Sequence, residues 1–129
     1  MTDTPTMNTI SSNELNRQQI STAGDKIRLS DTDKEYGLDL FCYKECNTSD
    51  EEWIKQCRGV VFHDDEIIMQ AFPFTDEYTL KDISSFDLTD CQVFKSYEGT
   101  LIRMFYFKDK WFVTTHRKLD AYKSKWASK

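Results

Sequence analysis

The stretch that decides the fold runs from Lys95 to Trp126 and reads KSYEGTLIRMFYFKDKWFVTTHRKLDAYKSKW. It contains two apolar, aromatic-rich runs, 101–107 and 111–115, which are separated by the polar tripeptide 108–110. Two such runs around a short polar loop are typical of an antiparallel β-hairpin. The sequence therefore predicts a hairpin in the C-terminal third of the chain.

Polar residues lie just outside both arms of this hairpin. Lys95, Glu98 and Gly99 precede the first arm, and the tripeptide His-Arg-Lys at 116–118 follows the second. Because a hairpin brings its outer ends together, we expect these groups to converge at one end of the ribbon. Basic groups on a rigid scaffold suit a phosphate or a nucleotide. We therefore expect the functional site at this end of the hairpin.

Charge is distributed unevenly along the 129 residues, whose net charge is −5. Residues 1–90 carry 8 basic and 19 acidic side chains, whereas residues 91–129 carry 9 basic and 3 acidic ones. Basic residues interleaved with aromatic residues in the positive third suggest a surface that faces a polyanion. Lysine-rich strand ends and an exposed helix would give the same composition, so both interpretations stay open.

The length fits one small domain or part of a larger one. All 18 aromatic residues lie at or after Tyr36, so the core must come from the last three-quarters of the chain. No run approaches the roughly 18 apolar residues that a membrane-spanning helix needs, and no secretory leader is visible. We expect no membrane association and a cytoplasmic location, in the host cytoplasm if the protein is viral.

Four cysteines are present, at positions 42, 46, 57 and 91. Without an export signal, they are expected to be reduced and partly buried thiols. Three of them together with His63 would supply enough ligands for zinc, but no Cys-x-x-Cys pair occurs. We assign no metal-ligating residues.

The N-terminal part of the chain, residues 1–25, is rich in polar residues and contains no aromatic residue. It predicts a flexible tail, with at most a marginal helix around Asn13–Ile20. Residues 26–36 are highly charged and are interpreted as a lead-in. Residues 37–46 predict a strand with Leu38, Leu40 and Cys42 on one face.

The middle of the chain predicts a short helix and a second hairpin. Ser49 and Glu52 have the spacing of a capping box, so a helix is expected from Asp50 to about Gln56. Strands at 60–63 and 67–72, joined by the acidic turn 64–66, complete the hairpin. Residues 91–95 predict another strand and 119–126 the start of a helix. The fold class is α+β, mainly antiparallel sheet with short helices.

Three stretches together resemble the nucleotidyltransferase domain of phage-type ATP-dependent RNA ligases, which also occur in large DNA viruses. The first is the Arg-Gly strand CRGVVF at 57–62, and the second is the aromatic connection FPF at 72–74 with Tyr78. The third is YEGTLI at 97–102 with THRK at 115–118. The resemblance covers about residues 35–129, so residues 26–129 look like the first half of such a domain.

This resemblance implies that ATP, with Mg²⁺, adenylates a lysine, that AMP passes to an RNA 5′-phosphate, and that a 3′-hydroxyl then closes the RNA. Lys95 is the candidate nucleophile. The family places its lysine three residues before the glycine, where this chain has Ser96, and Lys95 is four residues before Gly99. On a strand, one residue of offset turns a side chain to the opposite face, so Lys95 requires a bulge or a loop.

Other residues are candidates for binding or packing roles. Arg58 is expected at the nucleotide phosphates, and an ion pair with Glu51 or Glu52 is its alternative. Glu98 is expected at the ribose or a metal, and Gly99 at a close backbone approach or a positive φ. Arg103 is expected to point outward or to pair with an acid. Arg117 and Lys118 are expected at phosphate or RNA, and an exposed helix entry is their alternative. Packing in the core or on a sheet face is expected for Phe105, Phe107, Trp111 and Phe112.

Three functions remain open at this point. One is an RNA-ligase-like nucleotidyltransferase that uses ATP and acts on RNA ends, and that is incomplete in this chain. Another is a non-catalytic nucleotide- or RNA-binding module that keeps the fold. The last is an interaction domain whose basic end docks an acidic partner. The sequence leaves the choice between RNA and DNA and the oligomeric state undecided.

Overall fold

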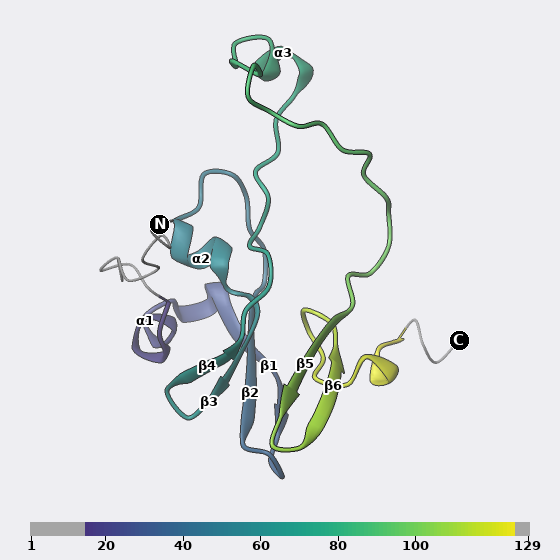
Figure 1. The fold of residues 1–129 in the computed structure, drawn as a ribbon. Helices are drawn as coiled ribbons and strands as arrows, with labels where there is room; N and C mark the ends of the chain where they lie inside the picture. Colours follow the sequence, from purple (N-terminus) through teal and green to yellow (C-terminus); the bar gives the residue numbers. More distant parts are fainter. Residues whose placement is uncertain (1–14, 126–129) are drawn as a thin grey trace, which may run out of the picture.

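A computed structural model describes residues 15–125 of the chain (Figure 1). Its α-helices and 3₁₀-helices are short, and its six strands form two antiparallel sheets. In chain order the elements are α1 (Arg17–Ser21), η1 (Gly24–Lys26), β1 (Ile27–Asp33), β2 (Leu38–Tyr43), α2 (Glu52–Gln56), β3 (Arg58–His63), β4 (Glu66–Met69), α3 (Leu80–Ile83), β5 (Arg103–Phe107), β6 (Lys110–Thr114) and η2 (Ala121–Lys123). The predicted α+β class with antiparallel sheets and few short helices is confirmed.

The larger sheet contains four antiparallel strands in the order β1-β2-β3-β4. Along β2 the side chains alternate between buried and half-buried, with Leu38, Leu40 and Cys42 all buried. This confirms the predicted strand and its inward face. The hairpin predicted for residues 60–72 is also present as β3 and β4, although β4 already ends at Met69.

The smaller sheet is the predicted C-terminal hairpin of β5 and β6. Phe107 pairs with Lys110, so the loop contains only Lys108 and Asp109. Both loop residues have positive φ, 47° and 63°, which is the pattern of a type I′ turn. This turn matches the twist of the strands, and it makes the loop one residue shorter than the tripeptide seen in the sequence.

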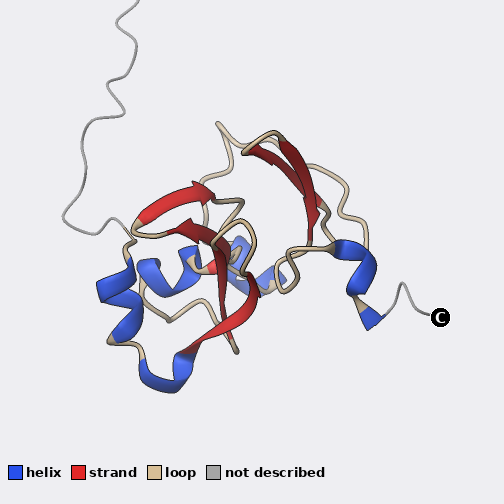
Figure 2. Cartoon of the chain, turned by 90° about the horizontal axis from the view of Figure 1, so that it is seen from below, coloured by secondary structure: helices blue, strands red, loops and turns tan. Residues whose placement is uncertain are grey.

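The four-stranded sheet is covered on both faces (Figure 2). On one face, Val60 and Phe62 of β3 join a core with Leu15 and Ile20 from the region of α1. On the other face, Val61 joins residues of β2 and the hairpin in a second core. The buried members of this second core are Leu38, Leu40, Val61, Phe105, Phe112 and Leu119. The hairpin therefore packs onto the sheet with one of its faces.

The N-terminal segment contributes to the first core within the described residues. Leu15 and Ile20 are only 2% and 6% exposed. The marginal helix expected around residues 13–20 is observed as α1, and Asn16 caps it by accepting a hydrogen bond from the Gln19 N–H. Residues 15–25 thus pack against the sheet, while residues 1–14 of the expected tail lie outside the described part.

A long connection, residues 70–102, links β4 to β5 and loops away from both sheets (Figure 1). We call this segment the arm. Its first part is anchored, because the Phe74 N–H donates to the Lys55 carbonyl and Asp76 pairs with the Lys55 ammonium at 2.9 Å. Its only described helix, α3, is preceded by its N-cap Thr79, which forms a capping box with Asp82. Beyond α3, almost every side chain of the arm is exposed.

Four local predictions are wrong. Residues 26–36, interpreted as a charged lead-in, contain strand β1. Residues 91–95, predicted as a strand, lie in the arm because they bond to no neighbouring strand among the described residues. The capping box at Ser49 is absent, because α2 begins after Glu51 and that residue makes no side-chain cap. Within the described residues, the predicted helix 119–126 is limited to η2, which Asp120 caps.

Candidate functional site: a basic pocket beside the hairpin

Arg103 joins the hairpin to the large sheet. Its guanidinium donates to the Arg58 carbonyl at 3.0 Å and to the Thr115 carbonyl at 2.7 Å. The residue is only 7% exposed, so the expected outward position or acidic partner is wrong. Burial lowers its pKa from 12.5 to about 10, which still leaves it charged at neutral pH. The two carbonyl oxygens replace the water that a buried guanidinium loses.

A pocket of about 560 Å³ opens where the end of β6 meets β1. We call it the basic pocket. Among the described residues that line it, none is acidic. The lining residues are Arg28, Leu29, Ser30, Thr100, Thr115, His116, Arg117, Lys118, Ser124 and Lys125. Cationic side chains, an imidazole and several hydroxyl groups are a donor set that suits phosphate oxygens.

Two hydroxyl groups of the basic pocket lack hydrogen-bond partners. The Oγ atoms of Ser30 and Ser124 are buried, and the structure gives neither of them a partner. Ser124 is 7% exposed. A buried hydroxyl without a partner is unfavourable and is normally satisfied by a ligand or by water. Both residues line the pocket, but these two oxygen atoms are shielded from it and do not by themselves indicate an occupant.

The electrostatic potential at the pocket is positive. Burial lowers the pKa of His116 below its usual 6.5, and the charges of Arg117, Arg58 and Arg103 lower it further. Three cationic groups close enough to disfavour another positive charge on His116 will favour a negative charge at the same place. Arg28 and Arg117 also line an adjoining hollow on the other side, so their two cations stand between two open spaces.

The backbone around Thr115 holds the cationic residues in place. The Thr115 N–H donates to the Lys118 carbonyl at 2.9 Å. In return, the Thr115 Oγ1 accepts from the N–H groups of Arg117 and Lys118 at 3.3 and 3.1 Å. Thr115 is 4% exposed, so this turn is fixed by the core below it. The basic pocket therefore has a rigid floor.

The structure brings together only part of the site expected from the sequence. Arg117 and Lys118 line the basic pocket. Lys95, Glu98 and Gly99 lie on the exposed arm and are not among its lining residues, although Thr100 is. Convergence at the end of the hairpin is thus observed from Thr100 onward. The expectation fails for the three earlier residues because no strand holds them beside the hairpin.

Lys95 lies in a loop, not on a strand. Its Nζ is 5.3 Å from the centre of the Tyr97 ring. Gly99 has a φ of +149°, which agrees with the expected positive φ, but no atom lies within 4 Å of the position that a Cβ would occupy. Among the described residues, no backbone therefore approaches Gly99 closely. Because Lys95 is not on a strand, its one-residue offset from the family spacing does not determine the direction of its side chain.

Arg58 lies next to the basic pocket without lining it. Its side chain is half-buried, and its charge contributes to the lowered pKa of His116. Of the two acids considered as its partners, Glu52 pairs instead with Lys55, at 3.1 Å. Sequence reasoning missed Arg28, because β1 was interpreted as a charged lead-in. The alternation of Ile27 and Leu29 around Arg28 is the signal that would have identified the strand.

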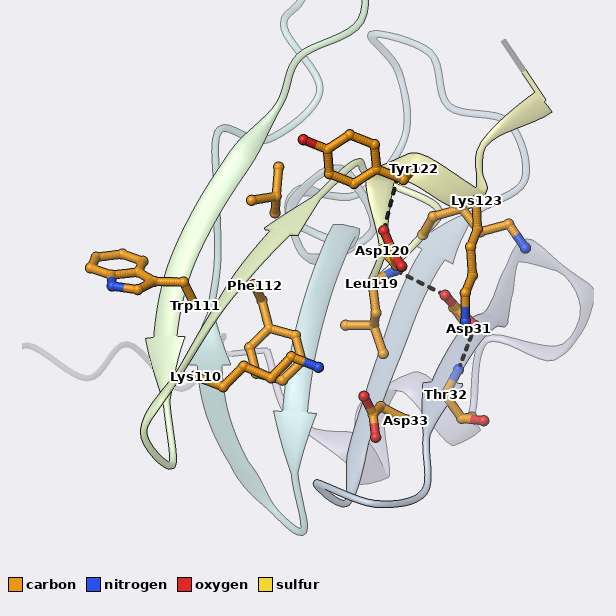
Figure 3. A pocket seen from close by; sticks show the side chains of 12 residues that line it. Asp31, Thr32, Asp33, Lys110, Trp111, Phe112, Leu119, Asp120, Tyr122 and Lys123 are labelled. Atoms are coloured by element: carbon orange, nitrogen blue, oxygen red, sulfur yellow. Dashed lines mark hydrogen bonds between the residues drawn. The ribbon is translucent and has the colours of Figure 1, made fainter. Parts of the chain in front are cut away.

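A second pocket of about 340 Å³ lies between β1 and β6 and shares Lys118 with the basic pocket (Figure 3). Figure 3 shows Asp31, Asp33 and Asp120 on one side and Lys110 and Phe112 on the other. Asp31 accepts a hydrogen bond from the Leu119 N–H at 2.9 Å, which ties the segment after β6 to β1. Its three carboxylates make this pocket less suitable for phosphate than the basic pocket.

The described residues contain no group of three or more His, Cys, Asp or Glu side chains that could hold a metal ion. All four cysteines are free thiols, and Cys42 and Cys57 are buried. Burial raises the pKa of both buried thiols, so they remain protonated and unreactive. Within the described part of the chain, no helix is long and apolar enough to cross a membrane.

The four aromatic residues expected in the core or on a sheet face differ in burial. Phe105 and Phe112 are buried and stack with their ring centres 5.0 Å apart, as expected. Phe107 is half-buried at the edge of the second core. Trp111 is 61% exposed on the opposite face of the hairpin. There it packs against the Tyr106 ring, with the ring centres 5.3 Å apart, as expected for a residue on a sheet face.

Comparison with known proteins finds relatives in viruses. The chain is 44% identical over 111 residues to the immediate-early protein ICP-46 homolog of Invertebrate iridescent virus 6, a match that covers 79% of this chain and 24% of that protein. It is 28% identical over 97 residues to immediate-early protein ICP-46 of Frog virus 3 (isolate Goorha), covering 75% of this chain and 24% of that protein.

A shorter match links it to the ICP-46 homolog of Invertebrate iridescent virus 3, with 58% identity over 41 residues, 32% of this chain and 9% of that protein. No protein-family profile matches the chain, and no solved structure does. The chain is thus similar to viral immediate-early proteins named ICP-46, of which it spans about a quarter of the length or less.

Proposed function

We propose that this protein binds the phosphates of ATP in the basic pocket, as the nucleotide-binding part of an RNA-ligase-like nucleotidyltransferase. The observation that carries the proposal is the pocket itself, whose described lining offers cations and hydroxyls but no carboxylate. The charges of Arg117, Arg58 and Arg103 support it, because they disfavour another positive charge on His116 and so favour an anion there. The resemblance of residues 35–129 to phage-type RNA ligases supplies the reaction.

Arg28 and Arg117 are proposed to bind the phosphates, since both line the basic pocket. A planar guanidinium donates two parallel hydrogen bonds to phosphate, which positions as well as neutralises it. Lys118 adds a point charge, and His116 donates when it is neutral through one ring nitrogen. Together these groups would withdraw negative charge from the polyphosphate and favour its departure.

Lys95 is proposed to reach the bound nucleotide through movement of the arm. It precedes Thr100, at the edge of the pocket, by five residues, which span at most about 17 Å when extended. The exposed side chains of this part of the arm leave it free to fold over the pocket. Such closures commonly assemble a reactive site around a bound substrate.

The proposed reaction is a transfer of AMP. The Lys95 Nζ releases a proton to solvent and attacks the α-phosphorus of ATP, so a P–N bond forms while the P–O bond to pyrophosphate breaks. Pyrophosphate leaves with the electron pair. An oxygen of an RNA 5′-phosphate then attacks the same phosphorus, the P–N bond breaks, and the lysine amine leaves with that electron pair and takes up a proton. The described residues do not fit a protein-held Mg²⁺, so the magnesium that accompanies ATP is treated as part of the substrate. The proposed setting is the host cytoplasm.

The proposal is tested by incubating the protein with Mg²⁺ and ATP labelled at the α-phosphate, followed by intact mass measurement. A covalent AMP adduct is expected in the wild type and in the Lys81→Ala control, a lysine on the exposed helix α3. It should be absent in Lys95→Ala, which keeps ATP binding, and in Arg117→Ala, which loses it. An adduct that survives in Lys95→Ala would refute the role of Lys95.

The alternative is a binding module without transfer chemistry. The position of Lys95 outside the basic pocket favours it. In that case ATP or a short RNA binds with the same dependence on Arg117, but no adduct forms under any condition. Failure of both ATP and RNA to bind at low salt would leave the interaction-domain interpretation, because phosphate contacts are strongest at low ionic strength.

A further inference from the structure

The hairpin of β5 and β6 has one buried face and one bare face. Phe105 and Phe112 point into the second core. Met104, Tyr106 and Trp111 point the other way and are 61%, 54% and 61% exposed. We call these three residues the outer hairpin face. Strands with apolar side chains on both faces usually have both faces covered by other parts of a protein. Among the described residues, nothing covers the outer hairpin face.

The outer hairpin face is ordered and apolar. Tyr106 and Trp111 are directly paired across the strands, and their ring centres lie 5.3 Å apart. The Tyr106 hydroxyl donates to Asp109 at 3.1 Å, which fixes the ring at the edge of the hairpin. Aromatic and Met side chains held by strands at such exposure are enriched at protein interfaces. Their arrangement requires no folding of the surface before a partner binds.

The arm shows the same feature. Val93, Phe94 and Tyr97 are 90%, 78% and 79% exposed, and the arm runs directly into β5. Six large apolar or aromatic side chains within about twenty residues of chain are thus open to solvent. Single exposed apolar residues are common, but a group of them concentrated on one hairpin and its approach indicates an interaction site.

The lengths of the relatives identify the occupant. The matches to the proteins of Invertebrate iridescent virus 6 and Frog virus 3 cover most of this chain but only 24% of each relative. Those proteins therefore contain a large amount of polypeptide outside the matched region. We infer that the outer hairpin face is a docking surface for a polypeptide segment equivalent to that unmatched part of the ICP-46 relatives, which packs on it as a further layer.

This inference does not depend on the proposed nucleotide chemistry. The outer hairpin face and the basic pocket share no residue. Docking of the segment does not require ATP binding, and ATP binding does not require docking of the segment. The two proposals can therefore fail separately.

The test uses the 129-residue chain and the unmatched part of the Invertebrate iridescent virus 6 relative, expressed as a separate polypeptide. Sedimentation analysis is expected to show a one-to-one complex. Trp111→Glu and Met104→Glu should each weaken it at least about tenfold, as for central interface residues. Leu80→Glu is the matched control, since Leu80 is 88% exposed but lies on α3. Circular dichroism verifies that each variant is folded.

A second readout avoids substitutions. Hydroxyl-radical labelling of Met104 and Trp111 is expected to slow about fivefold or more in the complex, on the scale of interface burial. Labelling of Tyr78, which is 51% exposed and directly precedes the N-cap of α3, should not change. The inference is overturned if the chain forms only homodimers that depend on Trp111, because a second copy is then the occupant. It is equally overturned if no complex forms and both residues stay accessible.

Discussion

Gly59 of β3 passes so close to His116 that a Cβ at Gly59 would lie 2.6 Å from the His116 Cα. The same Cβ would lie 2.6 Å from the Arg103 Nη1. Because real Cβ atoms essentially never come this close to another heavy atom, only glycine fits here. This contact seats the segment that carries the basic pocket directly on the large sheet.

Gly59→Ala should therefore destabilise the protein by about 2–4 kcal/mol, from overpacking and from the unfavourable φ of +75°. Gly24→Ala is the matched control, because Gly24 has a φ of +59° but no atom within 4 Å of its Cβ position. Its loss should be about 1 kcal/mol, the cost of the backbone alone. Urea unfolding measures both, and equal losses would contradict the close contact.

Arg103→Met should cost about 2–4 kcal/mol, because it leaves the carbonyls of Arg58 and Thr115 without their donor. Arg103→Lys should recover only part of this loss, since one ammonium cannot reproduce a guanidinium that reaches two carbonyls. Thermal unfolding gives the comparison, with Lys81→Met as an exposed control that should change little. If Arg103→Lys were as stable as the wild type, the geometry of the contact would be irrelevant.

Stability should fall on acidification through the range in which His116 titrates. Its pKa is lowered from 6.5 in the folded state, so below about pH 6.5 the unfolded chain binds a proton that the folded chain does not. The free energy of unfolding therefore decreases as the pH falls from 6.5 towards the lowered pKa of His116.

His116→Gln should reduce this slope, and urea unfolding at several pH values measures it. Inorganic phosphate should have a similar effect in the wild type, because an anion in the pocket offsets the charges of Arg117, Arg58 and Arg103. His63→Gln serves as the control for removing an imidazole elsewhere. A slope that His116→Gln leaves unchanged would show that other groups cause it.

The C-terminal hairpin and β2 were predictable because their apolar residues repeat with the period of a strand. β1 was not predicted, since five of its seven residues are charged or hydroxyl-bearing, and only Ile27 and Leu29 carry the apolar alternation of a strand. Arg117 and Lys118 were found from the sequence, because they directly follow the predicted hairpin. Arg28 was not found, because it lies on β1. Its place beside Arg117 is created by the packing of two distant segments.

Lys95 and Arg103 illustrate the opposite limit. An apolar run before a hairpin suggested a strand at 91–95, yet the structure provides no partner strand for those residues, and they remain in the arm. An arginine between apolar neighbours suggested an outward side chain, yet two backbone carbonyls receive Arg103 in the interior. Such hydrogen-bond partners come from remote parts of the chain, and no local pattern encodes them.

The most direct measurement is calorimetric titration of the protein with ATP at low and at moderate salt. Saturable binding that weakens steeply with salt is expected, because phosphate contacts depend on salt in this way. Arg28→Ala and Arg117→Ala should each reduce the affinity about tenfold, the usual effect of removing one charge-assisted hydrogen bond. The control Lys81→Ala should bind as the wild type does. Unchanged affinity in both arginine variants would contradict the assignment of the basic pocket as the phosphate site.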